Sequence, residues 1–348
     1  MFKEIKECCK KKEMDTIKRM ICLVATFLFI GSIALTEMSV HFLDVGQGDS
    51  ALVICDGEAM LIDGGPTNAS QKVYSYLRQH VEQLIYIVAT HPHEDHIGGL
   101  AAALNAVPVE LIFSPVEKSD SAAFQAMVKY ADLQGTPIIV PEEGDFFHLG
   151  EALITILHCW PEAWDTNDMS IVLRIDYGNT AFLFTGDAEA ITEYMLLDSG
   201  FPLEANVLKV GHHGSRSSST SEFVEAVYPE YAVISCGVGN SYGHPHEETL
   251  KTLANVTILR TDKLGTIVFH SDGNSVWFDS SKTEVIPEGD SHPMADSTLT
   301  YIGNKKSQRF HLPTCPGVQT MSEKNKVILS SREEAIELGY SPCGTCNP

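Results

Sequence analysis

Short apolar runs of strand length recur along most of the chain, and turns rich in glycine and aspartate separate them. In the first half, these runs and one stretch of helical spacing predict strands at 40–45, 51–55, 60–62 and 84–89, and a helix at 71–81. In the second half, the same signals predict strands at 152–157, 171–175, 181–184, 207–210, 232–235 and 266–270, and helices at 188–197, 221–227 and 247–253. Hairpins mixed with helices in two successive halves indicate an α/β protein with two packed sheets and helices outside them.

The start of the chain has a different pattern. Residues 1–20 hold seven Lys and Arg against four Asp and Glu, and residues 20–35 form an uncharged, mainly apolar run. A basic flank before such a run is typical of a membrane-targeting segment, and Ser32-x-Ala34 would suit a cleavage site, whereas a buried core helix is the alternative. The targeting interpretation makes residues 1–36 a signal peptide or membrane anchor. It places the rest outside the cytoplasmic membrane, either secreted or anchored.

A cluster of metal-binding residue types follows the apolar run at 84–89. It holds three imidazoles and a carboxylate, from His91, His93, Asp95 and His96, before Gly98-Gly99. Neutral imidazole nitrogens and carboxylate oxygens are ligands of zinc and similar divalent ions. His91 and His93, two apart on extended chain, can point to one side, while Asp95 and His96 can reach a second point as the chain turns. One loop is therefore predicted to serve two metals.

The motif His91-x-His93-x-Asp95-His96 resembles the signature loop of the metallo-β-lactamase fold. Further sequence motifs are similar to those of the hydrolase domain of ComEC-type DNA-uptake proteins. These motifs lie at residues 43–50, 61–65, 184–187, 210–215 and 242–246. The resemblance covers residues 38–280, which we expect to form the catalytic domain. It implies a four-layer αββα sandwich, whereas periodicity alone indicates only mixed α and β structure.

The second half is expected to complete the site. Asp187 follows an apolar strand, where its carboxylate could bridge two cations, although an ordinary helix cap is the alternative. The resemblance implies that His212 binds the second metal. Adjacent extended residues face opposite ways, so His213 is expected to point elsewhere, either behind a ligand or at the surface.

One histidine that relatives of this fold carry is missing, because the corresponding region reads Thr-Asn167-Asp168. The amide of Asn167, the carboxylate of Asp168 or a water could fill the position, which favours a weaker first site or a harder ion such as manganese. Carboxylates at strand ends often accept the second ring proton of a metal-bound imidazole. Of Asp44 and Asp63, we assign this role to Asp63, and a turn-forming Asx is the alternative. His244 could hold substrate, protonate a leaving group or only lock its loop.

Paired cations supply a hydroxide near neutral pH and neutralise a developing phosphoryl charge. We therefore expect a hydrolase with two zinc or manganese ions and no organic cofactor, in which a bridging hydroxide attacks a phosphodiester, and DNA outside the cell is a candidate substrate. The residues expected to take part in catalysis are Asp95, Asp187 and His244. Two alternatives stay open: hydrolysis of small or wall-linked esters such as phosphorylcholine esters, and a binding protein without activity. The oligomeric state is not predicted.

Charge bears on the substrate. Residues 21–304 carry eleven Lys and Arg and thirty-eight Asp and Glu, a net charge of −27. A protein that grips many phosphates needs a basic track, so long duplex DNA is less suitable than a short substrate. A local basic strip formed by Lys209, Arg216 and Arg260 is the exception that the sequence allows.

The end of the chain predicts a second, small unit. Residues 281–298 are polar and aperiodic, as in a linker, and residues 299–348 contain His311-x-x-x-Cys315 and Cys343-x-x-Cys346. This spacing indicates a structural zinc site without catalysis, and it resembles the zinc module of Ada DNA-repair proteins with His311 in place of one cysteine. A disulfide is the alternative, but three cysteines cannot all pair. Cys55, Cys159 and Cys236 are expected to be ordinary buried thiols.

Overall fold

The computed structural model describes residues 37–279, 301–311, 315–319, 321–329, 335 and 338–343. The chain forms two compact units, residues 1–285 and 286–348, and each is described by itself. The predicted targeting segment at 1–36 and the whole predicted linker at 281–298 lie outside the described residues. In the part of the chain that is described, no helix is both long and apolar enough to cross a membrane.

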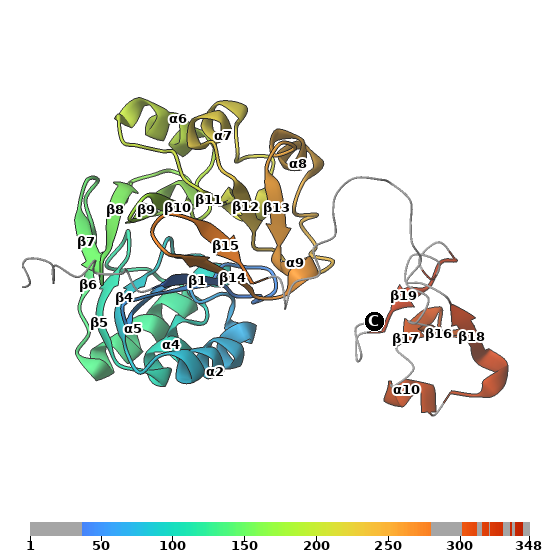
Figure 1. Cartoon of the computed structure of the whole chain (residues 1–348). Coiled ribbons are helices and arrows are strands. Elements are labelled where there is room, and N and C mark those ends of the chain that lie inside the picture. The colour runs from blue at the N-terminus through green and yellow to red at the C-terminus, as the bar shows by residue number, and fades with distance from the viewer. Residues whose placement is uncertain are drawn as a thin grey trace, which may run out of the picture. The chain divides into compact units, whose positions relative to one another are not determined.

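Two sheets form the centre of the larger unit (Figure 1). The first has the order β15 (Val276–Phe278), β14 (Ile267–Ser271), β1 (Met38–Phe42), β2 (Ala51–Cys55), β3 (Glu58–Ile62), β4 (Leu84–Val88), β5 (Val109–Phe113), β6 (Ile138–Ile139). The second has the order β13 (Thr257–Arg260), β12 (Tyr231–Ile234), β11 (Val207–Lys209), β10 (Thr180–Phe184), β9 (Val172–Tyr177), β8 (Ala152–His158), β7 (Phe146–Leu149). Apolar side chains of both sheets share one core, in which the rings of Phe42 and Phe184 stack with centroids 5.5 Å apart.

Helices cover the outer face of each sheet (Figure 1). The first sheet carries α2 (Ser70–His80), α4 (Leu100–Ala106) and α5 (Ala122–Gln134), and the second carries α6 (Ala190–Ser199), α7 (Ser221–Val227) and α8 (Glu247–Thr252). Short helical turns complete the unit at α3 (Glu94–Ile97), α9 (Thr261–Leu264), η1 (Thr67–Ala69), η2 (Asn167–Met169) and η3 (Gly211–Gly214). Helices, sheet, sheet and helices make four layers, which confirms the predicted αββα class.

Every strand and helix predicted in this unit is present, with ends that agree or differ by one to three residues. The elements that were not predicted are α3, α4, α5, α9, β5, β6, β7, β13, β15 and the short turns η1, η2 and η3. The helix α5 has apolar residues on most of its positions, and α4 is short and alanine-rich, so neither shows a clear amphipathic stripe. Their burial against α2 and the first sheet, rather than their own pattern, makes them helical.

The strand directions explain where a site can form. The strand β4 is parallel to β3 and β5, and β10, β11 and β12 are parallel to one another. The carboxyl ends of parallel strands meet at one edge of a sheet, where side chains leave the core and face a crevice. Thr90, Asp187 and His212 all lie just beyond such ends.

Within the described part of the smaller unit, one sheet has the order β18 (Lys326–Leu329), β16 (Tyr301–Asn304), β17 (Arg309–His311), β19 (Ser341–Pro342). The unit also has α10 (Pro316–Gln319) and η4 (Glu323–Asn325). Phe310, Leu329 and Ala335 form one apolar cluster, and Cys315 and Cys343 belong to another. Such small cores rarely hold a fold of this size without a further link.

Candidate metal centre

Asp187 lies at the centre of a cluster of imidazoles. Its carboxylate is buried, with Oδ1 3.2 Å from Nε2 of His96. Three more imidazole nitrogens lie within 4 Å of its Oδ2: Nε2 of His213 at 3.4 Å, of His212 at 3.8 Å and of His91 at 4.0 Å. Residues from positions 91 to 213 therefore converge on one carboxylate, as a site with paired cations requires.

The loop after β4 supplies the first group of side chains. Nε2 of His91 lies 3.0 Å from Nδ1 of His93, and Oδ2 of Asp95 lies 3.3 Å from Nε2 of His213. The loop packs closely on the backbone before it, since a Cβ at Gly48 would lie only 2.3 Å from the carbonyl oxygen of Asp95. Glycine at this position lets the backbone approach the site.

Asp63 fixes the orientation of His96. Its Oδ2 lies 2.7 Å from Nδ1 of His96, and its Oδ1 accepts a hydrogen bond from the backbone N–H of Thr90 at 2.8 Å. This leaves Nε2 of His96 facing Asp187, as predicted for a carboxylate behind a metal-binding imidazole. Asp44 lies elsewhere, with its Oδ2 3.3 Å from Nζ of Lys72.

His213 points into the site, so the expectation that it faces away is wrong. That expectation assumed extended backbone, but φ is 47° at His212 and 53° at His213, both left-handed. Nδ1 of His213 lies 3.0 Å from the carbonyl oxygen of Ser235, which directs Nε2 toward Asp95 and Asp187. Glycines on both sides of the His-His pair were the sequence signal for this tight turn.

His212 occupies the wall beside Asn167. Nδ1 of His212 and Nδ2 of Asn167 lie 3.0 Å and 3.3 Å from the same carboxylate oxygen, Oε1 of Glu189. The amide oxygen of Asn167 is buried and has no hydrogen-bond partner among the described residues. Glu189 thus links Asn167 and His212, and it is a contact that the sequence did not reveal.

Asp49 and Lys209 form a buried ion pair behind His213. Nζ of Lys209 lies 2.6 Å from Oδ2 of Asp49, and Oδ1 of Asp49 lies 3.2 Å from Nδ1 of His213. The sequence interpretation treated the loop of Asp49 as pocket wall and Lys209 as part of a basic strip. Both side chains are instead almost fully buried.

These carboxylates control the charge of the histidines. Burial disfavours the charged ring of His96, but Asp187 and Asp63 outweigh burial and raise its pKa well above the usual value. At His213, too, the carboxylates of Asp187 and Asp49 outweigh burial and raise the pKa of the ring well above the usual value. Burial and the charge on His96 lower the pKa of His91 well below its usual range. The centre is thus built to hold positive charge.

The donor set fits divalent cations. Nε2 of His96 and Oδ1 of Asp187 are 3.2 Å apart but make no hydrogen bond, and neither has another such partner among the described residues. Ligand atoms of Asp49, His96, Asp187 and His213 all lie within 4.8 Å of one another. Buried polar atoms without partners are rare in native proteins and are explained here if a cation lies among them.

An open pocket leads to this centre. Its volume is about 300 Å³, and its lining is mainly polar: Gln47, His93, Glu94, Asp95, Asn167, Asp187, His212, His213, Tyr242 and His244. Burial and the neighbouring histidines lower the pKa of His244 to about 4, so its ring is neutral at pH 7. A neutral ring with so low a pKa is a poor proton donor, which favours the binding or loop-fixing roles of His244.

Comparison with known sequences decides the family. Residues 43–238, more than half of the chain, match the family described as the metallo-beta-lactamase superfamily. The chain belongs to the metallo-beta-lactamase superfamily. The predicted resemblance to this fold is therefore confirmed.

Relatives of this metallo-beta-lactamase unit include competence proteins. The chain is 30% identical to "ComE operon protein 3" of Bacillus subtilis over 71% of its own length and 35% of that protein. It is 31% identical to "Competence protein ComA" of Neisseria gonorrhoeae over 67% of its own length and 32% of that protein. The chain thus spans about a third of the length of these relatives, and the predicted similarity to ComEC-type proteins is confirmed.

Among solved structures, the "metallo-beta-lactamase fold protein YhfI" from Bacillus subtilis is similar with a TM-score of 0.48 and 13% identity. The match covers 68% of this chain and all of that one.

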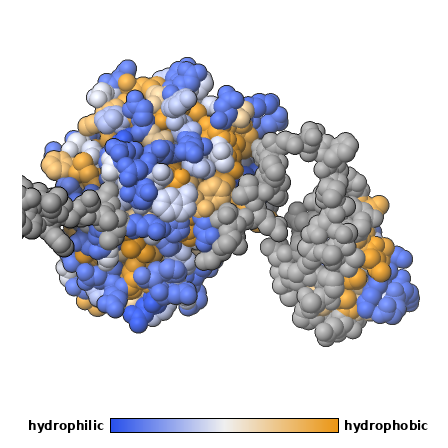
Figure 2. Space-filling view, viewed as in Figure 1, coloured by the Kyte–Doolittle hydropathy of each residue, from blue (hydrophilic) through white to orange (hydrophobic). Residues whose placement is uncertain are grey.

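Lys209, Arg216 and Arg260 do not form the local basic strip that the sequence allowed. Each of its three cations has an acidic partner: Lys209 with Asp49 at 2.6 Å, Arg216 with Glu248 at 3.4 Å and Arg260 with Asp262 at 2.6 Å. The face shown in Figure 2 is mostly hydrophilic, and hydrophobic residues interrupt it in small patches. No local excess of positive charge from these residues offsets the net charge of −27.

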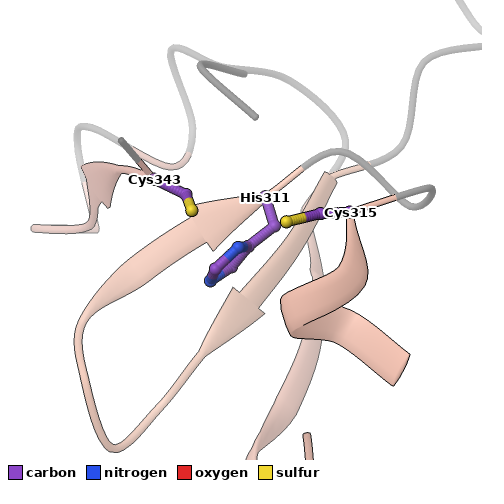
Figure 3. Close-up of side chains that lie close together, drawn as sticks. All are labelled: His311, Cys315 and Cys343. Carbon is purple, nitrogen blue, oxygen red and sulfur yellow. The ribbon is translucent and has the colours of Figure 1, made fainter. Parts of the chain in front are cut away.

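The smaller unit brings together three of its four predicted zinc ligands. Ligand atoms of His311, Cys315 and Cys343 lie within 4.8 Å of one another, and their side chains converge in Figure 3. Nδ1 of His311 is buried and has no hydrogen-bond partner in the described part of the chain. Cys346 lies outside the described residues. The similarity of this unit to the Ada module stays a prediction.

Proposed function

We propose that this chain is an exported phosphodiesterase that depends on two divalent cations and acts on DNA. One observation carries the proposal: Asp187 lies within 4 Å of four imidazoles, and Asp95 lies beside them in an open pocket. The names of the relatives, a competence protein among them, support DNA as the substrate.

We assign the ligands in two groups around Asp187. His91 and His93 hold the first cation, with Asn167 or His212 in the place of the missing histidine. Asp95, His96 and His213 hold the second. This differs from the assignment that the resemblance implies, because Nε2 of His213 is nearer to Asp95 and Asp187 than Nε2 of His212 is to Asp187. Thiolate ligands favour zinc, whereas oxygen ligands suit manganese. Because this site offers an amide oxygen and imidazoles but no thiolate, manganese is a candidate beside zinc.

The chain's own residues prepare the site for an anionic substrate. Bound divalent cations supply an activated water and neutralise charge on a phosphoryl group. The carboxylate of Asp63 orients the ring of His96. The backbone carbonyl of Ser235 and the carboxylate of Asp49 orient the ring of His213, so both imidazoles stay in place. His244 lines the same pocket, where a neutral ring N–H can donate to a substrate oxygen.

In the smaller unit we propose a structural zinc ion bound by His311, Cys315, Cys343 and Cys346. The three described ligands are buried and adjacent, and no carboxylate belongs to their group among the described residues. A closed site of this kind stabilises a small fold without taking part in catalysis.

The export of the chain is inferred from its first residues. It rests on the basic residues 1–20 and the apolar run at 20–35. Protease treatment of intact cells, with the chain detected by antibody, tests it. Cleavage of the chain on intact cells is expected, and full protection would contradict export.

The activity is tested with the full-length chain, loaded with manganese or zinc. Supercoiled plasmid, single-stranded oligonucleotide and bis-p-nitrophenyl phosphate serve as substrates, and Asp187→Asn is the inactive control. Cleavage of plasmid or oligonucleotide by the wild type alone is expected. Turnover of the small diester without cleavage of DNA would favour the hydrolase of small or wall-linked esters. No turnover of any substrate by the metal-loaded chain would favour the binding protein.

A further inference from the structure

An exposed aromatic ring stands at the rim of the metal pocket. Tyr242 is 65% exposed and lines the same pocket as Asp187 and His213. Its ring stacks on that of His244, with centroids 5.6 Å apart and planes 21° apart. One side of the tyrosine is thus supported, while most of its surface remains open to a ligand.

The supporting ring is held firmly in place. The backbone N–H of His244 donates to Oδ1 of Asn240 at 2.9 Å, and Nδ2 of Asn240 donates to the carbonyl oxygen of His244 at 2.6 Å. The ring of His244 also contacts His212 edge-on, with centroids 5.5 Å apart. Successive rings therefore lead from the candidate metal ligand His212 through His244 to Tyr242 at the rim.

Because the unit is strongly acidic, an aromatic ring that stacks on bases would help it to bind a nucleic acid. Three basic residues considered for contact with a phosphate backbone, Lys209, Arg216 and Arg260, are each paired with a carboxylate. Stacking of a base on an aromatic ring does not depend on net charge, and every nucleobase has a face that can stack. An acidic protein can therefore gain affinity for a strand through its bases.

We propose that Tyr242, supported by His244, stacks an unpaired nucleobase next to the phosphodiester that is cleaved. This deepens the proposed function and rests on it. It makes Tyr242 a specificity residue that selects strands with accessible bases over diesters without a base. A paired base in an intact duplex cannot stack on Tyr242, so single strands and frayed ends are the favoured substrates.

Exposure alone does not create such a subsite, and the chain offers a matched control. Tyr228 is 85% exposed but lines a different cavity, with Arg174, Glu204 and Glu230. It has no place in the metal pocket. Tyr228→Ala removes a ring that is even more exposed than Tyr242 and reports the effect of that loss elsewhere on the surface.

The test compares Tyr242→Ala, Tyr242→Phe and Tyr228→Ala with the wild type. The substrates are a short single-stranded oligonucleotide and the same strand with abasic residues beside the cleaved bond. For the strand with bases, Tyr242→Ala is expected to raise KM about tenfold, with kcat changed much less. Tyr242→Phe and Tyr228→Ala are expected to keep the wild-type KM. The abasic strand is expected to bind wild type and Tyr242→Ala equally weakly.

A binding signal separates this inference from the activity itself. 2-Aminopurine next to the cleaved bond loses fluorescence when it stacks, and stopped-flow mixing reads this before cleavage. Quenching by the wild type and Tyr242→Phe but not by Tyr242→Ala is expected, even if the wild type cleaves nothing and the proposed function fails. Equal quenching by Tyr242→Ala, or an equal rise in its KM on both strands, would overturn the stacking role of Tyr242.

Discussion

Nδ1 of His96 lies 2.7 Å from Oδ2 of Asp63, on the opposite side of the ring from Asp187. The contact fixes which ring nitrogen faces the pocket. Asp63 also binds the backbone N–H of Thr90, so its own position is set by the end of β4. Asp63, 33 positions before His96 in the sequence, thereby orients this proposed metal ligand.

Asp63→Asn is expected to weaken metal binding about 10–100-fold, because a neutral amide stabilises the N–H of a metal-bound ring less than a carboxylate does. Competition with a chromogenic chelator measures the affinity. Asp44→Asn is the control, since Asp44 contacts Lys72 and not a histidine. Equal affinities of wild type and Asp63→Asn would refute the assignment of Asp63.

His213→Ala and His212→Ala are expected to differ in metal content. His213 is the proposed ligand of the second cation, so its alanine variant should lose one metal ion per chain relative to the wild type. His212→Ala should keep both ions with weaker binding, because Asn167 remains beside the first. Elemental analysis after gel filtration gives both counts. If His212→Ala loses one metal ion and His213→Ala keeps both, His212 and not His213 is the ligand of the second cation.

Lys209→Met is expected to destabilise the fold by about 3–5 kcal/mol, because it leaves the carboxylate of Asp49 buried without its cation. The double variant Lys209→Met with Asp49→Asn should recover part of this loss. Urea unfolding followed by circular dichroism measures both. Arg216→Met, which removes an exposed pair with Glu248, should change stability by less than about 0.5 kcal/mol. A similar loss for both single variants would contradict a special role for the buried pair.

The cysteines are expected to fall into two classes of reactivity. Burial raises the pKa of the Cys55 and Cys159 thiols to about 12 and that of Cys236 to about 11, so all three stay protonated at pH 8. Since only the thiolate reacts, native protein should not be alkylated there below the pH of those pKa values. Cys315 and Cys343 should become reactive when a chelator removes the proposed zinc.

Mass spectrometry after iodoacetamide treatment reads each site. Protein in urea with chelator is the positive control, in which every cysteine should be modified. Alkylation of Cys315 and Cys343 in native protein before chelation would contradict the structural zinc site. A disulfide between them would instead resist iodoacetamide until a reductant is added.

The pattern of the chain gave most of the secondary structure, and particular elements show where it could not. The strand at 51–55 and the helix at 221–227 have the predicted ends, because turn residues or a capping Thr220 mark them. The helix α5 has no such contrast between faces, although Ser121 caps it, because apolar residues lie around much of its circumference. Packing against α4 and the first sheet decides its burial.

By itself the sequence determined the ligand types, the loop that presents His91, His93, Asp95 and His96, and the family, because these depend on residues close in the chain. Only the tertiary structure decided that His213 enters the site, that Asp49 and Lys209 lie buried behind it, and that Tyr242 stands at the rim. The physical reason is that a side chain's direction follows from local φ and ψ, and its charge from neighbours distant in sequence. A left-handed turn at two histidines reverses an inference drawn from extended chain.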